Sequence, residues 1–146
     1  MPENTSKVLN LFISTGDKEM PRLEKERITI DEHGIISDKF YNKDINRSIL
    51  ITSEDSYKIA KENDVDIESG TLGENILIDI NPYHLKTGDK IQIAQTVLEV
   101  TQNCTLCNGL SKIDSKLPKL LKNDRGIFFR TLIGGEIKKG DSITIL

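Results

Sequence analysis

Two cysteines and two histidines are the residues whose types and spacing could support chemistry in this chain. Cys104 and Cys107 form a Cys-x-x-Cys spacing directly after the apolar and polar alternation of residues 97–102, which predicts a strand that runs into a loop. Loops on a rigid scaffold commonly present reactive residues to a cleft. His33 and His84 both precede the cysteines and have no close His-x-His spacing. Any reactive site is therefore expected to centre on the cysteine pair.

Three interpretations of the cysteine pair stay open at this point. A dithiol redox site uses a helix N-terminus to lower a thiol pKa, but the alternating βαβ pattern of such folds is missing around the pair. Half of a zinc site would need further ligands, and His33 and His84 are poorly spaced for that role. The third interpretation makes both thiols small buried hydrophobic groups.

Length, charge and the chain ends restrict the class of protein. The 146 residues fit one domain, residues 1–146, since two domains of half that size would each be too small to be stable without cross-links such as disulfides or metal ions. Lys and Arg total 20 against 23 Asp and Glu, which argues against a dedicated nucleic-acid binder. No apolar run is long enough to cross a membrane, and the polar residues 1–7 do not resemble a signal peptide. We therefore expect a cytoplasmic protein with reduced thiols.

Short alternating segments predict a mainly β protein. Strands are expected at residues 8–13, 27–30, 47–52, 75–80 and 127–132. Ser53 is a suitable N-cap for a helix over residues 54–63, and a second short helix is expected through residues 117–121. Many short strands with only two helices fit a closed or partly closed β-barrel.

One internal echo supports this expectation. Residues 86–93 and 138–145 share Lys, Gly, Asp and two isoleucines at matching positions. In each, a Gly-Asp turn (Gly88-Asp89 and Gly140-Asp141) leads into an alternating strand whose isoleucines share one face. The echo predicts two equivalent strands in a barrel, with both aspartates as turn residues.

Several elements in order along the chain resemble the MOSC domain, which is the C-terminal module of molybdenum cofactor sulfurases and also occurs alone. The most specific is Gly70-Thr71-Leu72-Gly73-Glu74-Asn75, which is similar to the family's Gly-x-Leu-Gly-Glu-Asn element. The others are Pro21-Arg22, residues 34–39, residues 47–50, Gly88-Asp89, residues 100–107, Arg125-Gly126 and residues 134–141. The resemblance implies a MOSC-type, pyruvate-kinase-like β-barrel with a few short helices.

The resemblance also implies roles for the thiols. Cys107 lies five residues after Gln102 and three before Leu110, and so matches the family's cysteine better than Cys104 does. Family members use that thiol as a molybdenum ligand or as a proposed carrier of sulfane sulfur. Soft thiolates suit both tasks. Cys104 has no firm counterpart and is a bystander or a resolving thiol.

A molybdopterin presents a phosphate and a polar ring, so its site requires cations and amide donors. The candidate cofactor-binding residues are Asp38, Lys39, Arg47, Asn75 and Arg125. In the early turn, Ser37 stands where the family often has glycine, and Phe40 occupies a stretch where it often has a basic residue or histidine. Arg47 and Arg125 each border an expected strand, and a barrel could bring both to the rim that carries Cys107.

The resemblance implies a protein that binds molybdenum cofactor, either plain or sulfurated, and three classes of function remain open. The first is a molybdenum-dependent oxidoreductase, such as a reductase of N-hydroxylated compounds. The second is a sulfur transferase or carrier, and the third is a non-enzymatic module that binds a pterin or a protein. No desulfurase or iron–sulfur domain is recognisable, so catalysis is expected to need an electron-transfer or molybdoenzyme partner. Nucleic acid and membranes are not expected partners.

Overall fold

The computed structural model describes residues 6–103, 114–122 and 125–146, in which strands outnumber helices. Cys104 and Cys107 lie outside the described residues. The strands are β1 (Val8–Ser14), β2 (Arg22–Lys25), β3 (Arg27–Asp31), β4 (Gly34–Ile35), β5 (Ile49–Ser53), β6 (Ile76–Ile78), β7 (Lys90–Ile93), β8 (Thr96–Asn103), β9 (Ile127–Ile133), β10 (Gly135–Lys138) and β11 (Ile143–Ile145). The helices are α1 (Glu54–Glu62) and α3 (Leu117–Leu120), with a 3-10 turn, η1 (Ile45–Arg47).

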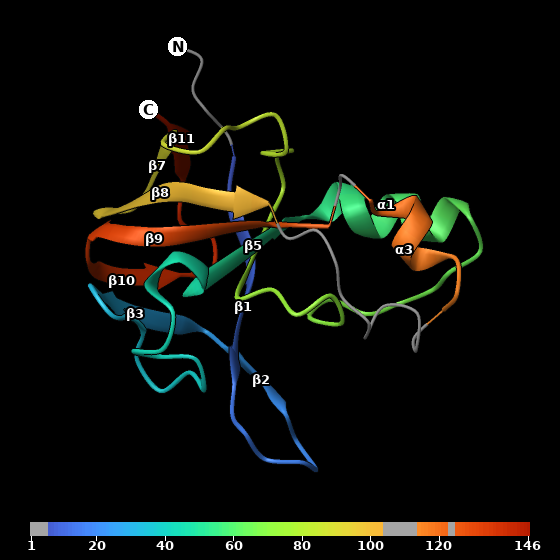
Figure 1. Ribbon diagram of the computed structural model, residues 1–146, viewed down its shortest axis with the longest axis horizontal. Helices are drawn as coiled ribbons and strands as arrows, with labels where there is room; N and C mark the ends of the chain where they lie inside the picture. Colours follow the sequence, from blue (N-terminus) through green and yellow to red (C-terminus); the bar gives the residue numbers. More distant parts are fainter. Residues whose placement is uncertain (1–5, 104–113, 123–124) are drawn as a thin grey trace.

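The strands form two sheets. An eight-stranded sheet has the order β11-β7-β8-β9-β5-β6-β1-β2, and a three-stranded sheet has the order β10-β3-β4. Figure 1 shows α1 and α3 together beyond one end of the larger sheet, with the β1–β2 hairpin extending away from the rest. The predicted mainly β class is confirmed. Pairing between the described strands leaves the larger sheet open at β11 and β2, so the closed barrel stays a prediction.

Alternation along the strands builds the main core. In β3 the apolar Ile28 and Ile30 are buried and alternate with exposed or half-buried residues, and in β8 Leu98 and Val100 are buried between half-buried neighbours. Every residue of β5 is buried, as expected for a strand in the middle of a covered sheet. The four side chains named in β3 and β8, together with Ile49 and Ile51 of β5 and Phe129 of β9, belong to one buried hydrophobic cluster.

The connection from β5 to β6 is a parallel crossover. Ile51 of β5 pairs with Ile76 of β6 in parallel, and such pairs need a long connection, which α1 supplies. The predicted cap is confirmed, because the Ser53 hydroxyl accepts a hydrogen bond of 3.0 Å from the Asp55 N–H. A second, smaller cluster packs α1 against α3 and contains Ala60, Leu72 and Leu117 among its buried residues.

The internal echo is confirmed as a pair of neighbouring strands. β7 and β11 pair in antiparallel fashion, with Ile93 opposite Ile143. Asp89 and Asp141 are turn residues, since their carboxylates accept the N–H groups of Lys86 and Lys138 at 2.8 and 2.7 Å. Ile143 and Ile145 lie opposite Ile93 and Ile91, so the isoleucines share one face as predicted, although Ile145 is 40% exposed.

Two boundaries differ from the sequence expectation. Arg47 does not open a strand; it ends η1, and β5 begins at Ile49 because the Asp44 carboxylate caps the 3-10 turn through the Asn46 N–H. The strand expected over residues 75–80 is confined to Ile76–Ile78. Among the described residues, no helix combines the length and apolarity that a membrane crossing requires.

Gly70 offers a test of this fold. Its φ is +91°, and an added Cβ would lie 3.0 Å from Cε1 of the buried Phe12 ring. Gly16 has φ +81° with no atom within 4 Å of an added Cβ. Gly16→Ala should cost about 1–2 kcal/mol from backbone strain alone, and Gly70→Ala should cost more because Phe12 must also move. Chemical denaturation measures both, and equal losses would contradict the packing against Phe12.

Candidate functional site

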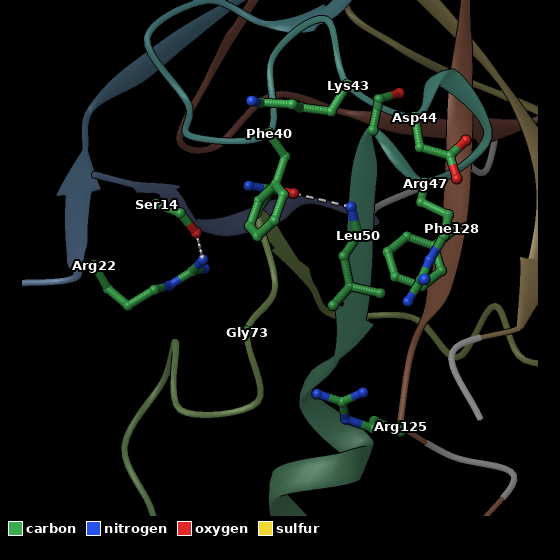
Figure 2. A pocket seen from close by; sticks show the side chains of 12 residues that line it. Ser14, Arg22, Phe40, Lys43, Asp44, Arg47, Leu50, Gly73, Arg125 and Phe128 are labelled. Atoms are coloured by element: carbon green, nitrogen blue, oxygen red, sulfur yellow. Dashed lines mark hydrogen bonds between the residues drawn. The ribbon is translucent and has the colours of Figure 1, made fainter. Parts of the chain in front are cut away.

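A cationic pocket of about 330 Å³ lies where β1, β2, β5, η1 and the segment before β9 meet. Four cationic side chains line it, and Asp44 is the carboxylate among its described lining residues. The cations are Arg22, Lys43, Arg47 and Arg125. Figure 2 shows them around one opening, with Phe40, Leu50 and Phe128 as apolar parts of the wall. A pocket with this excess of cations and an apolar lining suits an anion attached to a flat, partly apolar body.

Arg22 is held at the start of β2 by two hydrogen bonds. Its Nη1 donates to the Ser14 hydroxyl at 2.6 Å, and its Nη2 donates to the main-chain carbonyl of Glu74. Burial lowers the pKa of the Arg22 guanidinium from its usual value, and the carboxylates of Glu74 and Asp38 oppose this shift. Because a guanidinium stays protonated in proteins, Arg22 is a fixed positive charge.

Arg125 is the most buried cation of the pocket, with 7% of its surface exposed. Its Nη2 donates to the Leu72 carbonyl at 3.0 Å, and its own carbonyl accepts from the Thr52 hydroxyl of β5 at 2.9 Å. Arg47 is exposed and stacks above the Phe128 ring, with its guanidinium carbon 4.9 Å from the ring centre. The structure thus brings Arg47 and Arg125, far apart in sequence, to one pocket.

Asn75 lies in the pocket wall and is bonded on both ends of its amide. Its Oδ1 accepts from the Leu50 N–H at 2.9 Å, and its Nδ2 donates to the Phe12 carbonyl at 3.2 Å and to Asp38 at 3.3 Å. The side chain therefore ties β5 to β1. Its hydrogen-bonding capacity is largely used within the protein, which suits a structural role better than contact with a ligand.

Asp38 is not a lining residue of the pocket; it is buried and bonds residues that are. Its carboxylate accepts from the Ser14 N–H at 2.7 Å and from the Phe40 N–H at 2.9 Å, in addition to Asn75. The preceding Ser37 has φ +76°, a left-handed conformation that glycine adopts without strain. This agrees with the glycine often found there in the family that the sequence resembles, and the turn is made with serine instead.

Lys39 points to a neighbouring pocket rather than to this one. Its Nζ lies 5.5 Å from the centre of the Phe40 ring, and the second pocket shares Ser14, Arg22 and Phe40 with the first. Of the five predicted cofactor-binding residues, three therefore line the pocket: Arg47, Asn75 and Arg125. Their role toward a cofactor stays a prediction.

The predicted thiol ligand Cys107 and its neighbour Cys104 lie outside the described residues. The described part of β8 ends at Asn103, which pairs with Ile127 at the start of β9. Phe128 follows directly and lines the pocket. Within the described ranges, no group of three or more His, Cys, Asp or Glu side chains is arranged to hold a metal ion.

The family model of the MOSC domain matches residues 31–144. The chain belongs to the MOSC domain family. This confirms the resemblance that the ordered motifs predicted, and it covers most of the sequence. Among curated proteins, none matches this MOSC chain.

Solved structures share the fold of this MOSC chain. YuaD from Bacillus subtilis is 20% identical, with a TM-score of 0.80 over 94% of this chain and 93% of that chain. YiiM from Geobacillus stearothermophilus is 15% identical, with a TM-score of 0.72 over 97% and 75% of the two chains. YiiM from Escherichia coli is 16% identical, with a TM-score of 0.69 over 97% and 68%. At these identities the likeness establishes the shared fold.

Sequence reasoning missed three parts of the pocket. Arg22 appeared only as part of a family motif, and Lys43 and Phe128 were not singled out. The signal for Arg22 was its place after Pro21, at a strand start. Nothing in the local sequence marks Lys43 or Phe128, since each becomes a pocket residue only when η1 and β9 lie side by side.

Glu74 is the most deeply buried carboxyl near the pocket, and it faces away from it. Tyr57 of α1 donates to its two oxygens at 2.7 and 2.9 Å, and the Gly70 N–H donates to Oε2 at 3.0 Å. Burial raises the pKa of Glu74, while the hydrogen bond from Tyr57 and the charge of Arg22 oppose the rise. Burial and the adjacent Glu74 raise the pKa of the Tyr57 hydroxyl, which stays a donor.

The raised pKa of Glu74 predicts a pH-dependent stability. A carboxyl with a raised folded-state pKa binds its proton more tightly in the folded protein, so its stabilisation is complete below the unfolded-state pKa and declines as pH rises toward the folded one. From about pH 4.5 upward, wild type should therefore lose stability relative to Glu74→Gln by about 1.4 kcal/mol per pH unit within that window. Urea unfolding across pH measures this, and a constant difference would contradict the raised pKa.

Proposed function

We propose that this MOSC protein binds molybdenum cofactor in the cationic pocket, with Cys107 as the molybdenum or sulfur ligand. The observation that carries the proposal is the convergence of Arg22, Lys43, Arg47 and Arg125 on one pocket of a chain in this family. The proposal goes beyond family membership, which supports a MOSC-type function in general.

The described residues fit the anionic end of such a cofactor. Arg47 and Lys43 are exposed and can turn toward a phosphate, while Arg22 and Arg125 offer fixed guanidinium groups. Phe40 and Phe128 provide apolar surface for a flat ring. Asn75 and Asp38 act indirectly in this proposal, because their polar atoms already bond the main chain that shapes the pocket.

Bound molybdenum cofactor supplies two-electron oxygen-atom chemistry or, when sulfurated, transferable sulfur. The chain's own part is to neutralise the phosphate and to hold the ring beside Phe128. We place reduction of an N-hydroxylated compound with an electron-transfer partner first, with sulfur delivery as the alternative. Both use the same cations and the same thiol, so the pocket is common to the two.

We also infer that β1 and β11 close the larger sheet into the MOSC-type barrel. In support, Lys7 and Ser142 form an isolated antiparallel bridge. The Val8 N–H donates to the Asp141 carbonyl at 2.9 Å, and the Gly140 N–H donates to the Val8 carbonyl at 2.8 Å. Closure would hold the rim that carries the cations in place, because a closed barrel has no unpaired edge strand whose register could shift.

Metal and phosphorus analysis of protein from a molybdenum-replete host tests the proposal most directly. Stoichiometric molybdenum with phosphorus would support the oxidoreductase. Cyanide-releasable sulfur without metal would support the sulfur carrier. Protein that has neither, and that also fails to bind cofactor released from a molybdoenzyme, would overturn the proposal.

Cys107→Ser should abolish retention of molybdenum or persulfide, because a hydroxyl is a poor ligand for a soft metal and carries no sulfane sulfur. Cys104→Ser is the matched control and should retain most of it. Metal analysis and cyanolysis of both variants give the readout. Equal loss in the two variants would indicate a dithiol redox pair or a shared metal site instead.

Arg47→Ala should weaken cofactor binding about 10- to 100-fold, the effect of losing one charge-assisted hydrogen bond. Its melting temperature should stay close to wild type because the side chain is exposed. Arg125→Ala should both weaken binding and destabilise, since it leaves the buried Leu72 carbonyl without this donor. Arg125→Lys should restore binding only in part, because an ammonium lacks the planar fork.

Arg130→Ala provides the matched control for charge. Arg130 pairs with Glu99 at 2.6 Å and is not among the lining residues of the cationic pocket. Titration of the apo-protein with released cofactor should give near wild-type affinity for this variant. If Arg47→Ala binds the cofactor as tightly as Arg130→Ala does, Arg47 is a surface charge and is not part of the binding site.

A further inference from the structure

Two arginines of the cationic pocket, the partly buried Arg22 and the buried Arg125, donate to one short segment, Gly70–Glu74. Arg125 donates to the carbonyl of Leu72 at 3.0 Å, and Arg22 donates to the carbonyl of Glu74. The arginines come from opposite ends of the chain, at the start of β2 and just before β9. The distance between their guanidinium groups therefore depends on where this segment lies.

The far side of the segment is fixed by Tyr57, which stands on α1. The Tyr57 hydroxyl accepts from the Gly70 N–H at 3.1 Å and from the Leu72 N–H at 3.2 Å, and donates to the Glu74 carboxylate. One hydroxyl has a single proton and two lone pairs, so these contacts use all of its capacity. Glu74 is fully buried, and its carboxylate closes the segment on itself through the Gly70 N–H.

Packing adds a second link between the segment and the helices. The Leu72 side chain is 1% exposed and belongs to the cluster that joins α1 and α3. Its carbonyl faces the opposite way, toward Arg125. Tyr57 itself is not a lining residue of the cationic pocket. The segment thus has one side toward the helices and one toward the arginines.

We propose that Tyr57 and Glu74 are positioning residues that set the spacing of Arg22 and Arg125 and thereby the affinity of the pocket for its anion. This inference rests on the proposed binding function of the pocket. A guanidinium needs fixed acceptors behind it to stay in place for a ligand. The carbonyls of Leu72 and Glu74 are those acceptors, and Tyr57 holds the main chain that carries them.

Removing the Tyr57 hydroxyl tests the role. Tyr57→Phe removes the acceptor shared by the Gly70 and Leu72 N–H groups and one donor to the buried Glu74 carboxylate, which still accepts from the Gly70 N–H, so the segment should shift. We expect at least a tenfold loss of affinity for released molybdenum cofactor, and a parallel loss for inorganic phosphate. Calorimetric titration of the apo-protein at a temperature where both variants are folded gives the readout.

Tyr83→Phe is the matched control. The Tyr83 hydroxyl accepts from the Ser53 N–H at 2.9 Å and bonds the Ser56 hydroxyl at 2.6 Å, so it too supports the start of α1. It is not bonded to the segment Gly70–Glu74 in any described contact. Its loss should lower the melting temperature while changing affinity less than threefold. Equal affinity loss in both variants, or wild-type affinity in Tyr57→Phe, would overturn the positioning role.

Amide hydrogen exchange on the wild-type protein gives an independent test if Tyr57→Phe fails to fold. Saturation with phosphate or cofactor should slow exchange of the Gly70 and Leu72 amides, which face Tyr57, but not of the Ser53 amide, which faces Tyr83. Unchanged exchange at Gly70 and Leu72 on binding would contradict the coupling. If wild type binds neither probe, the proposed function itself fails, which is a different result from intact binding in Tyr57→Phe.

Discussion

The cost of holding cationic side chains out of water is the constraint on which the pocket depends. Four cationic side chains share about 330 Å³, and two of them are partly or fully removed from water. Removing cations from water is costly unless dipoles or opposite charges face them. Here Arg22 and Arg125 each donate to a main-chain carbonyl of one segment, and Arg22 also donates to the Ser14 hydroxyl. A carbonyl dipole stabilises a guanidinium without cancelling its charge, so the pocket stays attractive to an anion.

The walls of the pocket are held by buried polar groups that bond one another. Asn75 connects β5 to β1 and also reaches Asp38, which in turn orders the turn that carries Phe40. Such networks tolerate little change, because each partner removed leaves another buried group unsatisfied. The Gly-x-Leu-Gly-Glu-Asn element consequently has two tasks. Its carbonyls and its Asn75 side chain face the pocket region, while its Glu74 side chain and Leu72 side chain face α1.

Local sequence was a good guide to elements whose stability is local. Residue preferences that act within a few positions account for three kinds of element: the helix capped by Ser53, the two Gly-Asp turns and the alternating strands. It was a poorer guide where tertiary contacts decide. Arg47 was expected in a strand but ends a 3-10 turn, which Asp44 caps through the Asn46 N–H. The parallel pairing of β5 with β6 was not expected, since register between distant strands is set by the whole sheet.

The sequence by itself determined the family, the mainly β class and two arginines of the pocket, because ordered motifs and side-chain periodicity are written in the chain. Only the tertiary structure decided which cations converge. It added Arg22 and Lys43, directed Lys39 to the neighbouring pocket, and buried Asp38 where it bonds residues that line the pocket. The physical reason is that a pocket's charge depends on distances between elements far apart in sequence. Those distances are fixed by packing and buried hydrogen bonds, which no local pattern encodes.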